Sequence, residues 1–258
     1  MTDDHDLSGS VVLVTGGTRG VGRGITEAFL AEGADVVTCG RTEPEEPPAA
    51  GGRVASFVPA DVREPDEVDT MVAAIAEDKG RLDVVVNNAG GAPAAEAATA
   101  SPRFSTRIVQ LNLLAPLFVA QAANRVMQAQ PDGGSIVNIA SVSALRPSPG
   151  TAAYGAAKAG LVNLTQSLAV EWAPRVRVNA VSAGMILTEQ ADLHYGDGEA
   201  VARVAATVPL GRLGTPSDVG AACVFLASSR ASYVSGANLV LHGGGEAPAF
   251  LTAAEPPA

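Results

Sequence analysis

Short runs rich in apolar residues recur along the chain and predict buried strands. The first, at residues 11–14, is apolar at every position, which is typical of a strand covered on both faces, as in a parallel sheet. Further runs of this kind lie at residues 34–39, 54–58, 82–86, 135–141, 176–181 and 238–241. The pattern therefore indicates an α/β chain with seven strands.

Between these runs, apolar residues recur at the spacing of helices. One face of the first predicted helix carries Val21, Ile25, Ala28 and Phe29, and Gly33 can end it. A second helix is predicted to start at Pro65, because acids surround its first turn and its apolar residues share one face. Those residues are Val68, Met71, Val72 and Ile75.

Three more helices and one unusual loop are predicted. Residues 103–127 have the pattern of one long helix, in which Pro116 is expected to cause a kink. Another helix begins near Tyr154, and a third has Thr215 as its N-cap. Residues 41–52 contain three prolines and a glycine pair, so we expect a loop or a single turn there.

Length and composition favour one domain. With 258 residues, 47% of them hydrophobic, the chain can bury a sizeable core, and no segment resembles a linker. We predict one Rossmann-type domain over residues 1–245. The Ala/Pro-rich residues 246–258 are predicted to form a C-terminal tail.

Charge and cysteine content exclude several kinds of partner. A net charge of −10 disfavours nucleic acid and anionic membranes, both of which need a basic surface. The acidic N-terminus has no signal-peptide pattern, so we expect a cytoplasmic protein. Cys39 and Cys223 are expected to be buried as small hydrophobic residues, and no histidine cluster predicts a metal site.

The strongest chemical signal is a tyrosine and a lysine four residues apart. Tyr154 and Lys158 should share one face of their helix. A lysine there favours the phenolate and should lower the tyrosine pKa below its usual ~10, which would suit acid/base chemistry near neutral pH. The same spacing also occurs in ordinary surface pairs, so the pair alone decides nothing.

A glycine-rich turn follows the first predicted strand and opens the first helix. Residues 15–22 read Thr-Gly-Gly-Thr-Arg-Gly-Val-Gly. Gly16 permits the tight turn, Gly20 allows backbone to approach phosphates, and Gly22 allows close packing of helix on strand. The helix N-terminus then attracts a pyrophosphate. Strand, glycine turn and helix together predict a dinucleotide site.

These motifs together resemble the short-chain dehydrogenase/reductase family. The resemblance rests on Ser141, Tyr154, Lys158 and Asn112, on the glycine turn, and on Asn-Asn-Ala-Gly at residues 87–90, in the family's order across nearly the whole chain. It implies a doubly wound Rossmann domain with a seven-stranded parallel sheet in the order 3-2-1-4-5-6-7. The chain resembles 3-oxoacyl-carrier-protein reductase-like members, and reductases of sugars, steroids and small ketones are also similar to it.

The resemblance also implies an activity, which is hydride transfer between a nicotinamide cofactor and a carbonyl or secondary alcohol. Tyr154 would be the acid/base, Ser141 would hold the carbonyl oxygen, and Lys158 would bind the nicotinamide ribose. Asn112 would anchor a water on the proton path. Ser143 is the competitor for the serine role.

A larger set of residues is expected to contact the cofactor by the same resemblance. They lie in the glycine turn, after the third and fourth strands, in the catalytic helix, and in the turn after the sixth strand. They are Gly16, Thr18, Arg19, Gly20, Val21, Gly22, Arg41, Asp61, Val62, Asn88, Ala89, Gly90, Tyr154, Lys158, Gly184, Ile186 and Thr188. Asp61 could instead be a simple helix-flanking carboxylate, and Ala183 replaces the family's usual proline, which could loosen the last turn.

We expect the cofactor to be NADP(H) rather than NAD(H). NAD-specific sites place a carboxylate at the end of the second strand, where this chain has Arg41, and arginine suits a 2′-phosphate. Arg19 supplies a second positive charge. The alternative is NAD(H), served by Glu43 or Glu45.

The remaining predictions concern substrate and partners. We expect a small-molecule ketone, 3-oxoacyl compound or alcohol as substrate, with residues 189–208 as a variable substrate lid. By the resemblance, the helix after Tyr154 and the helix that contains Asn112 form one interface of a homotetramer, and the last strand region forms another. A non-catalytic, cofactor-sensing protein is the alternative function, although such proteins usually lose the tyrosine or lysine.

Overall fold

A single parallel sheet forms the centre of the molecule in the computed structural model, which describes residues 7–189 and 195–246. Over these residues, seven strands pair in the order β5-β2-β1-β6-β7-β8-β9, all parallel. Because β5 is the third of these strands along the chain, the predicted order 3-2-1-4-5-6-7 is confirmed. The strands are β1 (Val11–Thr15), β2 (Asp35–Gly40), β5 (Ser56–Pro59), β6 (Val84–Asn87), β7 (Gly134–Ser141), β8 (Val176–Ala183) and β9 (Asn238–Leu241).

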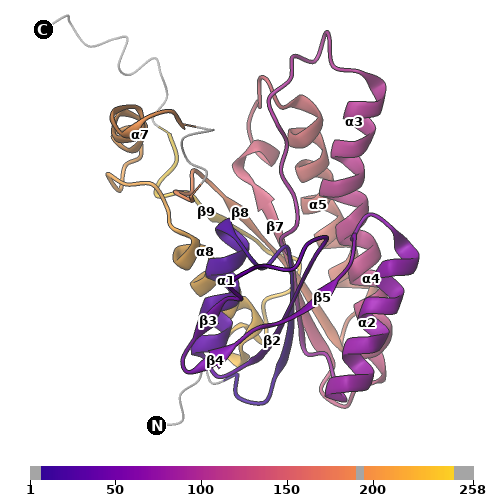
Figure 1. Ribbon diagram of the computed structural model, residues 1–258. Helices are drawn as coiled ribbons and strands as arrows, with labels where there is room; N and C mark the ends of the chain where they lie inside the picture. The colour runs from indigo at the N-terminus through magenta and orange to yellow at the C-terminus, as the bar shows by residue number, and fades with distance from the viewer. Residues whose placement is uncertain (1–6, 190–194, 247–258) are drawn as a thin grey trace, which may run out of the picture.

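Helices cover both faces of the sheet (Figure 1). On one face, α1 (Gly20–Ala31) packs against α8 (Pro216–Ala227). The other face carries α2 (Pro65–Lys79), α3 (Pro102–Val109), α4 (Ala115–Ala129) and α5 (Ala152–Glu171). Single-turn 3₁₀ helices span Val142–Ala144 and Ser229–Ala231, and α7 (Gly198–Ala205) lies apart, at the upper left of Figure 1.

The two hydrophobic cores explain why the run at residues 11–14 is apolar at every position. In β1, Leu13 belongs to the core under α2 and α4, whereas Val12 and Val14 belong to the core under α1 and α8. Successive side chains of a strand point to opposite faces, so a strand covered on both faces needs apolar residues throughout. The predicted burial of Cys39 and Cys223 is confirmed.

The proline-rich segment at residues 41–52 forms a loop, as predicted, and ends in a small hairpin. The hairpin pairs β3 (Ala49–Ala50) with β4 (Arg53–Val54) in antiparallel fashion. The prediction that Val54 belongs to the third strand of the sheet is therefore wrong. Val54 lies in the hairpin and is 61% exposed, and the sheet strand starts only at Ser56.

The predicted long helix at 103–127 is interrupted, although not at the proline itself. A π-helical turn, Gln110–Leu114, separates α3 from α4, and the Ala115 N–H donates to the Gln110 carbonyl five residues back. Pro116 has no N–H for the carbonyl of residue 112, so a regular α-helical bond cannot form there. The irregularity lies one turn before the proline, at Asn112.

Other local predictions are confirmed. Thr215 caps α8 in a reciprocal capping box with Asp218, and Gly33 adopts φ +83° just beyond the end of α1. Within residues 7–189 and 195–246, no helix combines the length and apolarity needed to cross a membrane.

Candidate active site

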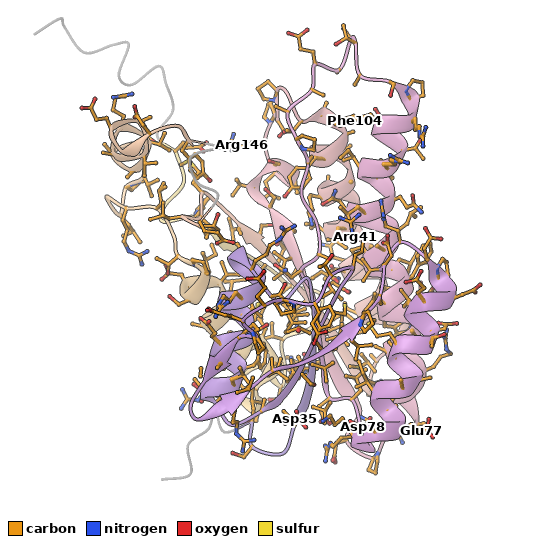
Figure 2. All side chains as sticks on the ribbon, in the orientation of Figure 1. Asp35, Arg41, Glu77, Asp78, Phe104 and Arg146 are labelled. Carbon is orange, nitrogen blue, oxygen red and sulfur yellow. The ribbon has the colours of Figure 1, made fainter. Side chains whose placement is uncertain are left out.

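A cleft of about 1080 Å³ opens beyond the carboxyl ends of the strands. Ligands of open α/β sheets bind at this edge. Figure 2 shows Arg41 and Arg146 toward this end of the molecule, with Asp35, at the start of β2, toward the other. All the residues predicted to contact the cofactor line the cleft, as do Ser141, Tyr154 and Lys158. Asn112 does not line it and lies just behind the wall.

Tyr154 and Lys158 lie on one face of α5, as the spacing predicted. The Lys158 Nζ lies 5.7 Å from the centre of the Tyr154 ring and donates to the Ile139 carbonyl at 2.7 Å. The Tyr154 hydroxyl makes a hydrogen bond with Ser141, at the end of β7. Ser143 also lines the cleft, but its backbone N–H donates to the Ser141 hydroxyl at 3.2 Å.

The expected lowering of the Tyr154 pKa is wrong for this structure. Burial raises the pKa of Tyr154, with a smaller contribution in the same direction from nearby Tyr195, while the hydrogen bond with Ser141 acts in the opposite direction. Burial also lowers the pKa of Lys158 to about 8. The ammonium bonds the Ile139 carbonyl and not the phenol hydroxyl, so its attraction for a phenolate does not outweigh the cost of burying one.

Asn112 fixes the backbone beside Lys158. Its side-chain amide donates to the carbonyls of Ile108 and Gly91, and its Oδ1 accepts from the Gly91 N–H, all within 3.0 Å. A Cβ on Gly90 would lie 2.7 Å from Asn112 Oδ1 and 3.3 Å from Lys158 Nζ. Asn112, which lies in the π-helical turn, therefore holds the Gly91 backbone in position.

The glycine turn has the geometry that its sequence implied. Gly16 has φ +62°, and a Cβ on Gly22 would lie only 2.1 Å from the Gly16 carbonyl oxygen. Asn88 ties this turn to β6, because its side chain donates to the carbonyls of Thr15 and Gly16 at 3.0 and 3.1 Å. Any side chain at position 22 would break this arrangement.

A carboxylate occupies the N-terminus of α1. The Gly20 N–H donates to Glu189 Oε1 at 2.9 Å, across 169 residues of sequence. Helix N-termini attract anions. The contact shows that the Gly20 N–H is available to bind an anionic group. Nothing in the sequence indicated this contact beyond the place of Glu189 directly after Thr188.

Three arginines, Arg19, Arg41 and Arg63, line the cleft near the end of β2. Arg19 and Arg41 are both exposed and line it, together with Asp61. Asp61 pairs with Arg63, whose Nε lies 2.9 Å from Oδ1. The Arg63 guanidinium is the main reason that the pKa of Asp61 is lowered, and Arg41 contributes less. Arg63 was not singled out from the sequence.

The turn after β8 is held from two sides. The Gly184 N–H donates to the Leu241 carbonyl, and the Leu187 N–H donates to the Gly214 carbonyl, both at 2.8 Å. Ala183, which stands where the family usually has proline, is buried at the end of β8. Of the predicted lid, residues 190–194 lie outside the described residues, as do residues 247–258 of the predicted tail.

Two further side chains of the cleft were not predicted as site residues. Tyr195 lines it near Tyr154, and Arg146 lines it from the loop between Ser141 and Tyr154. Over the described ranges, no three His, Cys, Asp or Glu side chains gather where they could hold a metal ion.

Comparisons with known proteins identify relatives along nearly the whole chain. The family described as enoyl-(acyl carrier protein) reductase matches residues 16–246. The L-rhamnose 1-dehydrogenase (NAD(P)(+)) of Azotobacter vinelandii is 38% identical, over 92% of this chain and 97% of its own length. The 3-oxoacyl-[acyl-carrier-protein] reductase of Chlamydia pneumoniae is 36% identical, over 93% of this chain and 98% of its own.

A solved structure gives the same result. The ligand-free aldohexose dehydrogenase of Thermoplasma acidophilum superposes with a TM-score of 0.86 at 32% sequence identity, covering 98% of each chain. The structural likeness covers nearly the whole chain, and the sequence relatives match over more than nine tenths of it. The chain therefore belongs to the short-chain dehydrogenase/reductase family of oxidoreductases, which act on alcohols and carbonyl compounds.

Proposed function

We propose that this protein interconverts a ketone or 3-oxoacyl compound and a secondary alcohol with NADP(H), using Tyr154 as the acid/base. The observation that carries the proposal is the meeting of Ser141, Tyr154 and Lys158 in the same cleft as the glycine turn. The cytoplasmic location stays a prediction from the sequence.

The cleft residues fit a dinucleotide. Gly16 and Gly22 leave the backbone at the start of α1 uncovered by side chains, and the Gly20 N–H there already donates to a carboxylate. Arg19 and Arg41 stand at one end of the cleft, and Tyr154 and Lys158 at the other. The cleft therefore has groups of suitable chemistry for the phosphates, the adenosine and the nicotinamide of such a cofactor. The residues that would hold the cofactor are those predicted from the sequence.

When bound, the nicotinamide supplies the hydride for reduction and accepts it in oxidation. Ser141 would hold the carbonyl oxygen by a hydrogen bond, and Tyr154 would donate its proton to the developing alkoxide. Burial keeps the phenol protonated near neutral pH, which suits an acid. The Lys158 ammonium, above the Tyr154 ring, would stabilise the phenolate that remains after proton transfer.

The preference for NADP(H) rests on charge at the β2 end. Arg41 follows β2 directly, and a guanidinium binds a phosphate through two parallel hydrogen bonds. The acidic side chains among the described residues that line the cleft are Asp61 and Glu189. Asp61 follows β5, the neighbour of β2, and its carboxylate is paired with Arg63. A free ribose 2′-hydroxyl would lack the carboxylate that NAD sites offer.

A kinetic comparison tests this function. A panel of ketones and secondary alcohols should show turnover, with kcat/KM at least about tenfold higher for NADPH than for NADH, a difference of about 1.4 kcal/mol. The double variant Arg19→Ala/Arg41→Ala should lose that preference, whereas Arg53→Ala, an exposed arginine of the β4 hairpin, should keep it.

The alternatives give different results. A preference for NADH would favour NAD(H) as the cofactor, with Glu43 or Glu45 at the ribose. An unchanged NADPH value in the double variant would also contradict our assignment. Binding of cofactor without turnover of any compound would favour a non-catalytic sensor.

A further inference from the structure

Arg146 places an exposed positive charge at the catalytic end of the cleft. We define this end by Ser141, Ser143, Thr151, Tyr154, Tyr195 and Arg146, all of which line it. It lies beyond β7, whereas Arg41 follows β2, and β1 and β6 separate these two strands in the sheet. Arg146 is thus at the wrong end to bind the phosphate on the adenosine side. Its side chain lines the cleft that also contains Ser141 and Tyr154.

The loop that carries Arg146 is held in place on both sides. The Gly150 carbonyl accepts from the Ala95 N–H at 2.8 Å, and Ser148 and Thr151 share a hydrogen bond of 2.6 Å between their hydroxyls. A Cβ on Gly155, in the first turn of α5, would meet Ser143 and Ser148 at 3.0 and 3.1 Å. This packing gives the arginine a fixed base beside Tyr154.

The partner of Arg146 comes from outside the cleft. Its Nη2 donates to Glu246 Oε1 at 2.6 Å, across 100 residues of sequence. Both side chains are well exposed, at 44% and 37%. In Figure 2, Arg146 lies between the α7 segment and the main body of the domain. Exposed ion pairs contribute little stability, so another carboxylate can replace Glu246 at small cost.

The arginine has donors to spare. Among the described residues, Glu246 is its one hydrogen-bond partner, reached through Nη2, so Nε and Nη1 remain for a ligand. A guanidinium presents its N–H groups in a planar fork that matches a carboxylate. The acidic side chains among the described residues that line the cleft are Asp61, which pairs with Arg63, and Glu189, which accepts from the Gly20 N–H. The side chains named with Arg146 in the definition of the catalytic end all bear hydroxyl groups.

From this arrangement we propose that the substrate is a small polar oxo acid or hydroxy acid, whose carboxylate binds Arg146 in place of Glu246. The proposal rests on the proposed oxidoreductase function and names its substrate class. Arg146 is then a specificity-determining residue, and Glu246 is an internal competitor for the substrate carboxylate. The hydroxyl groups of the catalytic end suit further polar groups on the substrate.

The test compares oxo acids of increasing chain length with their uncharged primary amides, using NADPH and NADH. For at least one pair, kcat/KM of the wild-type enzyme should be higher for the acid. Arg146→Gln should reduce the acid-to-amide ratio by about 10- to 100-fold, the scale of a charge-assisted hydrogen bond, mostly through KM. Glu246→Gln should raise kcat/KM for the acid about two- to fivefold. Arg53→Gln serves as the control and should keep the wild-type ratio.

Other outcomes would overturn the proposal. If amides are used as well as acids, or if Arg146→Gln keeps the wild-type ratio, the substrate carboxylate does not bind Arg146. If Arg146→Gln and Glu246→Gln each lower kcat/KM for the acid and for the amide by the same factor, the Arg146–Glu246 ion pair only holds the C-terminal segment in place. Arg146→Lys, which keeps charge but not the fork, should recover part of the ratio.

A binding measurement separates this proposal from the proposed function. If no compound is turned over with either cofactor, the proposed function fails. Calorimetry with the corresponding unreactive alkanoates then still decides the site: the dissociation constant should be larger for Arg146→Gln than for the wild type. Equal dissociation constants for the two proteins would refute the carboxylate site.

Discussion

At the scale of single residues, two opposing effects act on the pKa of Tyr154. Burial favours its neutral phenol, and the hydrogen bond with Ser141 favours the phenolate. Lys158 is itself 3% exposed, and its burial weakens its hold on a proton. A buried pair of this kind is costly to fold and therefore points to a function. Two predictions follow from its geometry.

The first concerns the proton donor. Tyr154→Phe removes the hydroxyl and leaves the ring beside Lys158, so the fold and cofactor binding should persist. Because the alkoxide loses its acid, kcat should fall at least about 10²-fold. Stopped-flow or steady-state absorbance of the nicotinamide measures the rate, and cofactor titration of the variant is the control. Retention of most activity would show that another group donates the proton.

The second concerns pH. The pKa of Lys158 is lowered to about 8, so the side chain is charged below that pH and neutral above it. Only the charged form stabilises the phenolate left by Tyr154, and kcat/KM reports the free enzyme. In the reducing direction, kcat/KM should therefore decline as pH rises past about 8. Circular dichroism across the same range checks that the protein stays folded, and a profile that is flat to strongly alkaline pH would refute the role of Lys158.

At the scale of elements, the sequence pattern predicted those features that depend on residues close together in the chain. Apolar runs predicted the strands because both faces of the sheet are covered, and the capping residues of α8 satisfy one another within four positions. The π-helical turn was missed because a proline in a helical pattern favours a kink, and only the packing of Asn112 on Gly91 shows where the turn widens.

The site divides in the same way. The positions of Tyr154, Lys158 and the glycine turn follow from spacing within one or two elements, and the structure brings them to one cleft. Glu189 and Arg146 were missed because their contacts join residues 169 and 100 positions apart. No local pattern encodes such pairs. The pKa of Tyr154 was predicted in the wrong direction because the sequence does not show burial.

The contact at the start of α1 gives a third prediction. Glu189 accepts from Gly20 where the phosphates of the cofactor are expected, so its charge should oppose them. Glu189→Gln should bind NADPH about two- to tenfold more tightly, measured by fluorescence titration. The control is Glu27→Gln, because Glu27 is a carboxylate of the same helix that pairs with Arg23. Unchanged or weaker binding by Glu189→Gln would mean that the carboxylate does not compete with the cofactor.

At the scale of the whole molecule, exposed apolar side chains gather near the end of α5 and the last strand. Val170 is 80% exposed and Tyr233 fully so, and Leu239 and Val240 of β9 are also exposed. A Cβ on Gly236, just before β9, would touch Ala169 of α5, so these segments adjoin. A cluster of large exposed apolar side chains more often marks a surface that contacts another molecule than one that stays in solvent.

This surface supports the expected homotetramer, which we propose has D₂ symmetry, with α5 and β9 at its interfaces. Light scattering at micromolar concentration should give four times the mass of one chain. The charged variant Tyr233→Glu/Val170→Asp should give a smaller species, because burying an unpaired charge in an interface is strongly unfavourable. Val54→Asp, which changes another exposed apolar side chain, in the β4 hairpin, should remain tetrameric. A monomer mass for the wild type would contradict the assembly, and a tetrameric double variant would place its interfaces elsewhere.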